Sequence, residues 1–247
     1  MADLAIIGGT GLTTLDGLVI TGREVVNTPF GEPSGPVVHG ELGGCEVLFL
    51  PRHGQGHTIP PHQINYRANL WALQSVGAEK IVAINAVGGI RPDMAPGRLA
   101  IPDQIIDYTG SRHNTFFDSD QTQVVHVDFT EPYCDELRRQ LIQAGENAGL
   151  DPVRDGTYAA TQGPRLETRA EVERLERDGC HLVGMTGMPE AVLARELAIC
   201  YASCCVVANW GASKDGDAVI TMEGIEEYLR QGMQDVRSLL SQLVGLL

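Results

Sequence analysis

Basic residues are scarce in this chain. Lys and Arg total 18 against 32 Asp and Glu, which gives the 247 residues a formal net charge of −14. Such an excess of acid disfavours nucleic-acid backbones and anionic membrane surfaces, so neither is expected as a partner. An anionic ligand would need a local positive pocket, and the few arginines therefore become informative.

Three further features are missing. The sequence has no apolar run of membrane-spanning length and no N-terminal signal, so we expect a soluble, cytoplasmic protein. The six cysteines form no C-x-x-C pair, and four of them lie in or beside apolar runs, where a reduced, buried thiol is the ordinary interpretation. Neither an internal repeat nor a linker interrupts the chain.

Apolar residues are plentiful and are arranged in alternating periods. They make up 43% of the chain, which is ample for a large core. Short apolar runs alternate with segments of helical period, so we predict an α/β fold whose mixed sheet is covered by helices on both faces. Residues 80–87 are typical of a central strand, and residues 201–208 predict another strand that ends on Asn209.

A glycine-rich turn, Gly-Gly-Thr-Gly at residues 8–11, follows a strand predicted for residues 4–7. The turn either presents backbone N–H groups and the Thr10 hydroxyl to an oxyanion, or it is a tight turn that needs positive φ. The residues themselves leave both interpretations open. A dinucleotide site is not indicated, because the third glycine of G-x-G-x-x-G is missing.

Arg52 and His53 follow a hairpin predicted for residues 37–50. Arg52 could hold a phosphate or carboxylate by paired hydrogen bonds, or form a surface salt bridge of little energetic value. His53 and His57 have a spacing seen in metal sites, but the glycines between them disfavour a helix and no carboxylate lies close in the sequence. A metal site is therefore not expected.

Two more polar positions end predicted strands. Asn85 stands in the otherwise apolar run before Ala86, and it is either a structural amide or a ligand contact. Thr186 begins a predicted helix that runs to Ala198. Ligands bind outside the carboxyl ends of strands in open α/β sheets. We therefore expect Thr186, the Asn85–Ala86 end and the earlier polar residues to converge on one neutral-to-positive anion cup.

Glu167 and Asn209 together could read the edge of a heterocycle. A carboxylate only accepts hydrogen bonds, whereas an amide both donates and accepts. Each has a structural alternative: Glu167 precedes a predicted helix over residues 169–178, and Asn209 could cap the end of its strand.

Five ungapped segments resemble the trimeric purine nucleoside phosphorylase family, and most of all its methylthioadenosine phosphorylase branch. They are residues 6–11, 52–54, 57–59, 65–73 and 185–190. The resemblance runs in consistent order from about residue 4 to residue 209. It implies one α/β domain over residues 1–247, with a mixed, partly barrel-like central sheet flanked by helices. It also implies a homotrimer, with active sites near subunit interfaces, that splits a purine nucleoside with inorganic phosphate and needs no metal or organic cofactor.

The resemblance assigns roles by position. The residues that match phosphate-binding positions are Thr10, Arg52, His53, Ala86 and Thr186. Met185 matches the residue that lies against the ribose. His126 matches a histidine that one subunit lends to its neighbour's 5′ pocket, and Thr221 lies where the family tunes that pocket.

This chain departs from the adenine-using branch at the base. That branch has Asp at the positions of Asn209 and Gly211, whereas Asn85, Glu167 and Asn209 match the inosine- and guanosine-cleaving branch. With a 6-oxopurine, Asn209 can donate to O6 and accept from N7–H while Glu167 accepts from N1–H. A 6-aminopurine would lose both pairings, at about 1–3 kcal/mol each. Asn209 is also the predicted catalytic residue, since it would stabilise negative charge at N7 of the leaving base.

The 52–73 segment, in contrast, is that of the methylthio branch, and the 5′ pocket is expected to include Glu167, Thr221 and His126 at its borders. The combination predicts cleavage of S-methyl-5'-thioinosine to hypoxanthine and 5-methylthioribose 1-phosphate. The alternatives are a general inosine/guanosine phosphorylase, a methylthioadenosine phosphorylase and, in a different class, a non-catalytic nucleoside-binding protein.

Overall fold

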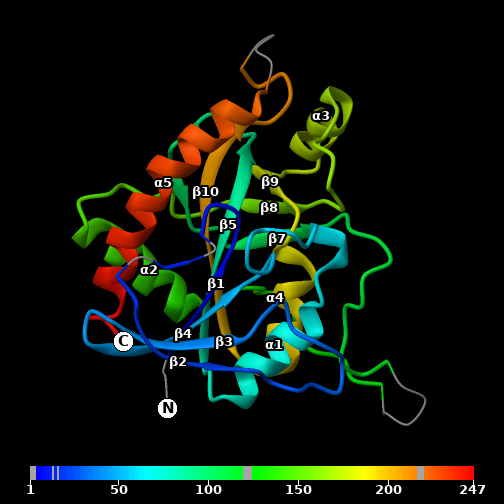
Figure 1. Cartoon of the computed structure of the whole chain (residues 1–247). Helices are drawn as coiled ribbons and strands as arrows, with labels where there is room; N and C mark the ends of the chain where they lie inside the picture. Colours follow the sequence, from blue (N-terminus) through cyan, green and yellow to red (C-terminus); the bar gives the residue numbers. More distant parts are fainter. Residues whose placement is uncertain (1–3, 13, 16, 119–123, 216–219) are drawn as a thin grey trace.

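A branched, mixed β-sheet with helices packed on both sides forms the molecule (Figure 1). The computed structural model describes residues 4–12, 14–15, 17–118, 124–215 and 220–247. The strands are β1 (Leu4–Gly8), β2 (Val19–Glu24), β3 (Val37–Leu42), β4 (Cys45–Pro51), β5 (Lys80–Gly89), β6 (Leu99–Ala100), β7 (Gln104–Asp107), β8 (Thr157–Ala160), β9 (Leu182–Gly184) and β10 (Cys200–Trp210). The helices are η1 (Pro61–Gln63), α1 (Tyr66–Ser75), α2 (Asp135–Asn147), α3 (Arg169–Arg177), α4 (Gly187–Glu196) and α5 (Met222–Leu243). The predicted α/β class is confirmed.

Strand β5 is the point at which the sheet branches. The main strand order is β2-β3-β4-β1-β5-β9-β8-β7, and β10 pairs with β5 off this path. β5 runs parallel to β1 and β10 but antiparallel to β9. The prediction of a central strand is confirmed, but β5 continues to Gly89. Asn85 and Ala86 therefore lie within the strand, whereas the apolar run predicts them at its end.

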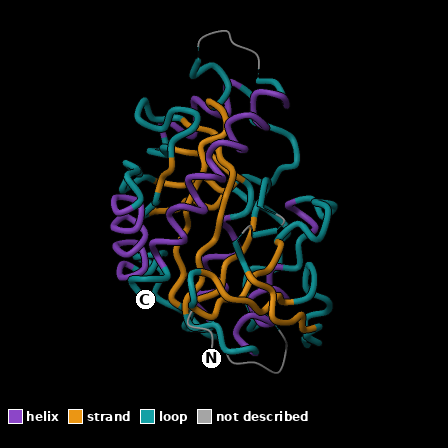
Figure 2. Tube along the Cα trace, turned by 60° about the vertical axis from the view of Figure 1, so that its left-hand side comes forward, coloured by secondary structure: helices purple, strands orange, loops and turns teal. Residues whose placement is uncertain are grey.

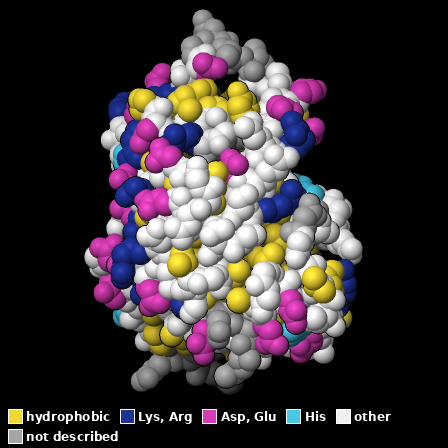
Figure 3. All heavy atoms as spheres, turned by 90° about the vertical axis from the view of Figure 1, so that its left-hand side faces the viewer, with side chains coloured by type: hydrophobic (Ala, Val, Ile, Leu, Met, Phe, Trp, Pro, Cys, Tyr) yellow, Lys and Arg dark blue, Asp and Glu magenta, His cyan; other side chains and the backbone are white. Residues whose placement is uncertain are grey.

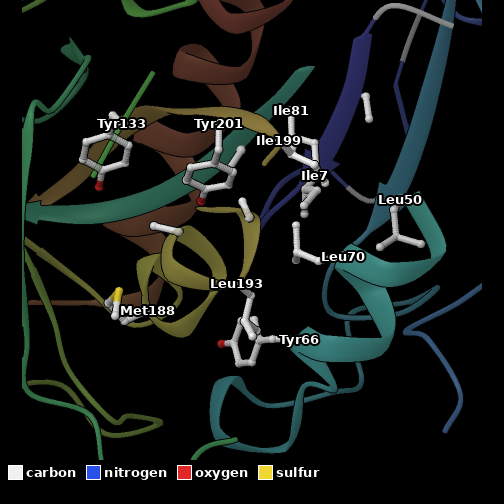
Figure 4. Close-up of a cluster of buried hydrophobic side chains, with 14 of the residues drawn as sticks. Ile7, Leu50, Tyr66, Leu70, Ile81, Tyr133, Met188, Leu193, Ile199 and Tyr201 are labelled. Carbon is white, nitrogen blue, oxygen red and sulfur yellow. The ribbon is translucent and has the colours of Figure 1, made fainter. Parts of the chain in front are cut away.

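The alternating side chains of β1 enter two separate cores. Ala5 and Ile7 pack in the core that α1 and α4 cover, whereas Leu4 and Ile6 pack in the core that α2 and α5 cover. Figure 2 shows helices on both sides of the strands, and Figure 4 shows Ile7 near Leu70 of α1, with Leu193 of α4 in the same cluster. Burial on both faces explains why this strand is apolar throughout.

The surface over α2 and α5 carries intermixed acidic and basic side chains (Figure 3). Among the residues that the structure describes, none of the helices combines the length and the apolarity that a membrane span requires.

The expectation of reduced cysteines is wrong at one pair. Cys134 and Cys200 form a disulfide across 66 residues of sequence. The backbone N–H of Cys134, which precedes α2, donates to the carbonyl of Tyr201 in β10 at 2.8 Å. This contact holds the start of the helix against the start of the strand and brings the two Cα atoms within 5.2 Å. The sequence alone offered no way to see that these two segments meet.

Candidate active site

A cavity of about 590 Å³ lies where the turn after β1, the loop after β4 and the ends of β9 and β10 meet the first turns of α5. The candidate site residues that line it are Thr10, Arg52, His53, Ala86, Glu167, Met185, Thr186, Asn209 and Gly211. Residues from six separate segments are thus brought together. Asn85, His126 and Thr221 do not line this cavity.

The turn after β1 lies against β5 because Gly9 has no side chain. A Cβ at Gly9 would lie 2.3 Å from the carbonyl oxygen of Ile84. The glycine therefore has a packing reason, and the same close approach delivers Thr10 to the cavity. The hydroxyl oxygen of Thr10 lies 3.0 Å from Nε2 of His57, which also lines the cavity.

Arg52 is part of a buried ion pair, and the alternative of a surface salt bridge is wrong. Its Nε and Nη2 each donate to Glu190 at 2.7 Å, and its Nη1 donates to the carbonyl of Ile84 at 2.9 Å. Both charged side chains are 0% exposed. Burial opposes the charge, yet the adjacent Glu190 carboxylate raises the pKa of Arg52 above its ordinary value. A guanidinium has five N–H donors. Three are used in these bonds, which leaves one N–H on each Nη nitrogen.

His53 contributes no positive charge near neutral pH. Burial and the neighbouring Arg52 charge lower the pKa of His53 to about 4. Its Nδ1 lies 2.8 Å from the carbonyl oxygen of Ile59, so Nδ1 carries the proton and Nε2 is left as an acceptor. The cup is therefore neutral in sum: one arginine is matched by Glu190, and the histidine is uncharged.

Asn85 lies behind the cavity wall. Its Oδ1 accepts from the Thr186 hydroxyl at 2.8 Å, and its Nδ2 donates to the Ser203 hydroxyl at 2.6 Å. Asn85 is 1% exposed. Of the two alternatives for Asn85, these contacts favour the structural amide, which here fixes the side chain of Thr186.

Glu167 is free of the helix-start role that its position suggested. The N-terminus of α3 is capped by Thr168, whose hydroxyl accepts from the Glu171 backbone N–H while the Glu171 carboxylate accepts from the Thr168 backbone N–H. Oε1 of Glu167 accepts instead from the Thr161 hydroxyl at 2.7 Å. This bond fixes the carboxylate at the cavity wall and leaves its second oxygen for a ligand.

Asn209 lies at a bulge in β10, where the register against β5 shifts between Val207 and Asn209. Its Nδ2 donates to the carbonyl of Trp210 at 2.7 Å. This local bond is the one that a strand-end cap would make. Asn209 lines the cavity, and its Oδ1 and its second amide hydrogen are not used by this bond. Gly211 N–H donates to Gly89 at 2.7 Å and closes the wall behind it.

Met185 packs against the segment that carries Glu167. A Cβ at Gly163 would lie 2.4 Å from the Met185 sulfur, and Gly163 has a φ of +61°. Glycine is thus needed for both the backbone conformation and the close approach. The same close approach fixes Met185 against the segment that leads to Glu167, and both side chains line the cavity.

One part of the cavity wall is apolar. The beginning of α5 supplies Met222, Ile225 and Leu229, and the loop after β4 supplies Ile59 and Pro60.

Two residues that the resemblance assigns to the 5′ pocket, Thr221 and His126, do not line this cavity. Thr221 caps α5 by accepting from the Gly224 N–H at 3.2 Å, and it lines a smaller adjoining cavity of about 170 Å³. His126 is exposed, in the segment after β7. Its assignment to a neighbouring subunit's pocket stays a prediction, as does the tuning role of Thr221.

A family model described as "Phosphorylase superfamily" matches residues 3–245. The chain belongs to the phosphorylase superfamily. The predicted family is thereby confirmed, and with it the class of enzyme.

Relatives of this phosphorylase are similar over nearly their whole length. A protein named probable S-methyl-5'-thioinosine phosphorylase, from Pseudomonas syringae pv. tomato, is 53% identical over 245 residues, which cover 99% of each chain. The 6-oxopurine nucleoside phosphorylase of Pyrococcus furiosus is 45% identical, with 100% of this chain and 94% of the relative covered. Among solved structures, a methylthioadenosine phosphorylase from Schistosoma mansoni in complex with adenine has a TM-score of 0.95 at 34% identity, covering 100% of this chain and 92% of that one.

Reasoning from the sequence missed one phosphorylase residue that the geometry makes central. Glu190 accepts from Arg52 and from the Tyr201 hydroxyl, the latter at 2.9 Å. The available signal was a carboxylate among apolar neighbours, Met188 to Leu193, since a carboxylate is seldom buried unless it is paired. Its partner, 138 residues away, could not be identified from that signal.

Proposed function

We propose that this phosphorylase cleaves S-methyl-5'-thioinosine with inorganic phosphate, releasing hypoxanthine and 5-methylthioribose 1-phosphate. The observation that carries the proposal is the arrangement of one cavity. Glu167 and Asn209, a pair suited to a 6-oxopurine, lie in its wall, and the apolar start of α5 forms another part of that wall. The names of the relatives from Pseudomonas syringae and Pyrococcus furiosus support a 6-oxopurine base.

The base would be recognised by matched donors and acceptors. The free oxygen of Glu167 accepts from N1–H, while Asn209 donates to O6 through its remaining amide hydrogen. When N7 takes up a proton from water as the base leaves, Oδ1 of Asn209 accepts from the new N7–H. As the glycosidic bond breaks, negative charge builds on the purine. Stabilisation of that charge by Asn209 is worth about 3–4 kcal/mol, by comparison with the loss of one oxyanion-hole donor in other enzymes.

The phosphate would lie between Thr10, Thr186 and the two unused N–H donors of Arg52. His53, neutral and with a bare Nε2, accepts a hydrogen bond from a protonated phosphate oxygen. The phosphate attacks the anomeric carbon and also stabilises the positive charge on the sugar in the transition state. In this scheme neither a metal nor an organic cofactor takes part, and the acids and bases of the protein only position charge.

The 5′-methylthio group would lie against the apolar part of the cavity wall, beside Ile225 and Leu229. Each buried CH₂ contributes about 0.8 kcal/mol, so a methylthio group favours this pocket over a 5′-hydroxyl. In a homotrimer, His126 of one subunit would complete the neighbour's pocket. Analytical ultracentrifugation of the wild-type protein tests the trimer.

The test of the function is a comparison of three nucleosides. Hypoxanthine release should require phosphate, and kcat/KM should fall in the order S-methyl-5'-thioinosine, inosine, S-methyl-5'-thioadenosine. Release without phosphate, or binding without turnover, would contradict a phosphorylase. Equal kcat/KM for inosine and S-methyl-5'-thioinosine would favour the second candidate, a general 6-oxopurine nucleoside phosphorylase, which the name of the Pyrococcus furiosus relative supports.

A substitution tests the base contact directly. Asn209→Asp should shift preference toward 6-aminopurine nucleosides, because a carboxylate accepts from the exocyclic amine but offers no donor to O6. With about 1–3 kcal/mol at stake for each unpaired group, the ratio of 6-oxo to 6-amino kcat/KM should change by about 10- to 100-fold. An unchanged ratio would remove Asn209 from the base contact.

A further inference from the structure

One guanidinium outside the cavity joins two segments of its wall. Arg112 lies in the loop after β7 and is half-buried. Its Nη1 donates to the carbonyl oxygens of Met185 and Met188, at 2.8 Å and 2.6 Å. Its Nη2 donates to the carbonyl oxygens of Gln162 and Thr161, at 2.8 Å and 3.3 Å. One side chain thus binds four carbonyls from two stretches that are more than twenty residues apart in sequence.

Further contacts fix the guanidinium plane itself. Nε of Arg112 donates to the side-chain oxygen of Gln162 at 3.1 Å. The guanidinium carbon lies over the ring of Tyr66, 5.5 Å from its centroid. Nη1 also donates to the Tyr66 hydroxyl at 3.3 Å. Among the described residues, no Asp or Glu lies within ion-pair distance of Arg112, so its partners are neutral oxygens and an aromatic ring. This arrangement requires the planar fork of arginine, which a lysine ammonium cannot reproduce.

Both segments continue into the cavity. Met185, whose carbonyl Arg112 holds, lines the cavity itself, as does the next residue, Thr186. On the other segment, Thr161 holds Glu167 through its hydroxyl at 2.7 Å, and Glu167 lines the cavity as well. The guanidinium therefore sets the distance between the carboxylate that faces the base and the side chain that faces the sugar.

We propose that Arg112 is a positioning residue for nucleoside recognition: its guanidinium holds the 161–167 and 185–188 segments in register, so that Glu167 and Met185 meet the same substrate molecule. The inference rests on the proposed function, since it concerns the fit of that substrate. Small displacements are costly here, because a shift of about 1 Å at a reacting centre can lower the rate about 100-fold.

Two variants and a matched control separate positioning from general stability. Arg112→Met removes the clamp, and Arg112→Lys keeps the charge without the fork. The control is Arg138→Met, because Arg138 also donates to carbonyls, those of Pro102 at 2.9 Å and Arg154 at 2.7 Å, but these two residues do not line the cavity. Circular dichroism and thermal unfolding establish that each variant is folded, and if Arg112→Met is insoluble then Arg112→Lys carries the same test.

The decisive measurement is the ratio of kcat/KM for the 6-oxopurine nucleoside to kcat/KM for the 6-aminopurine nucleoside. Loss of folded enzyme lowers kcat for every substrate alike and leaves KM and substrate preference unchanged. Misplacement of Glu167 lowers kcat/KM for the 6-oxopurine nucleoside by about 100-fold and for the 6-aminopurine nucleoside by less, so the preference falls. We expect this fall in both Arg112 variants and an unchanged preference in Arg138→Met.

Binding of hypoxanthine, measured by calorimetry, gives a second readout that does not depend on turnover. It should weaken at least about tenfold in Arg112→Met, in line with the expected displacement of Glu167. Wild-type protein without phosphate-dependent turnover would contradict the proposed function, whereas the calorimetry would still test the clamp. An Arg112→Met enzyme with wild-type nucleoside KM, preference and hypoxanthine affinity would overturn the inference.

Discussion

The Arg52–Glu190 pair gives the sharpest prediction, because both side chains are wholly buried. Glu190→Gln keeps the shape of the side chain and an acceptor for the Tyr201 hydroxyl, but it leaves the Arg52 charge without a counterion. Breaking a buried ion pair by removing one partner costs about 3–5 kcal/mol. We therefore expect Glu190→Gln to lower the free energy of unfolding by that amount.

A double-mutant cycle separates the stranded charge from the lost hydrogen bonds. In Arg52→Met/Glu190→Gln no charge remains, so the double variant should lie only about 1–3 kcal/mol below wild type, the cost of the polar groups left unpaired. It should thus be more stable than Glu190→Gln alone, although it should have lost the use of phosphate. The assay is urea unfolding in phosphate-free buffer, followed by circular dichroism.

Two results would refute the reasoning. If Glu190→Gln lost less than about 1 kcal/mol, the typical value for an exposed pair, then the pair would not be desolvated as the structure indicates. If the double variant lost the sum of the stability losses measured for Glu190→Gln alone and Arg52→Met alone, the two side chains would not be coupled.

Three further changes test other parts of the molecule. Burial depresses the folded-state pKa of His53 from 6.5 to about 4, so the unfolded chain is protonated first as the pH falls. About 3 kcal/mol of folding stability should therefore be lost between pH 6.5 and pH 4. In His53→Asn this loss of stability at acid pH should be smaller, as measured by urea unfolding at several pH values. Reduction, or Cys134→Ser, should lower the free energy of unfolding by about 4 kcal/mol, because the Cys134–Cys200 bond closes a loop of 66 residues; an equal effect of reductant on the Ser variant would contradict this. Thr161→Val, which removes the hydroxyl that holds Glu167, should lower kcat/KM for the 6-oxopurine nucleoside about tenfold, and a change in phosphate KM alone would contradict the assignment.

The sequence predicted those parts of the site that local motifs encode. Thr10, Arg52 and Thr186 each follow a strand in the structure, because an apolar run that stops at glycine, proline or a helix start is a local signal. The strands predicted within residues 4–7, 37–50, 80–87 and 201–208 were found for the same reason, whereas β2 was not predicted. One feature of the sheet was not predicted either: β9 runs antiparallel to β5, so the residues of the cup do not gather at a common carboxyl edge.

The contacts that the sequence could not predict are all between distant residues of ordinary local appearance. Arg112 lies in a stretch without helical or strand period, and nothing near it in sequence reveals that it binds carbonyls 50 and 73 residues away. Glu190 and the Cys134–Cys200 pair are similar cases. Their partners are chosen by the topology of the sheet, which local propensity does not determine.

The charge distribution explains how a strongly acidic protein can bind an anion. The net charge of −14 is spread over the chain, and at physiological salt its field decays over about 8 Å. Within the cup, Arg52 is matched by Glu190 and His53 is neutral, so attraction comes from hydrogen-bond donors at short range and not from a free cation. Such a cup favours an oxyanion that carries a proton for His53 to accept, and it can release the charged sugar phosphate afterwards because no unpaired cation holds it. A cup that is neutral in sum is thus compatible with anion binding and with turnover.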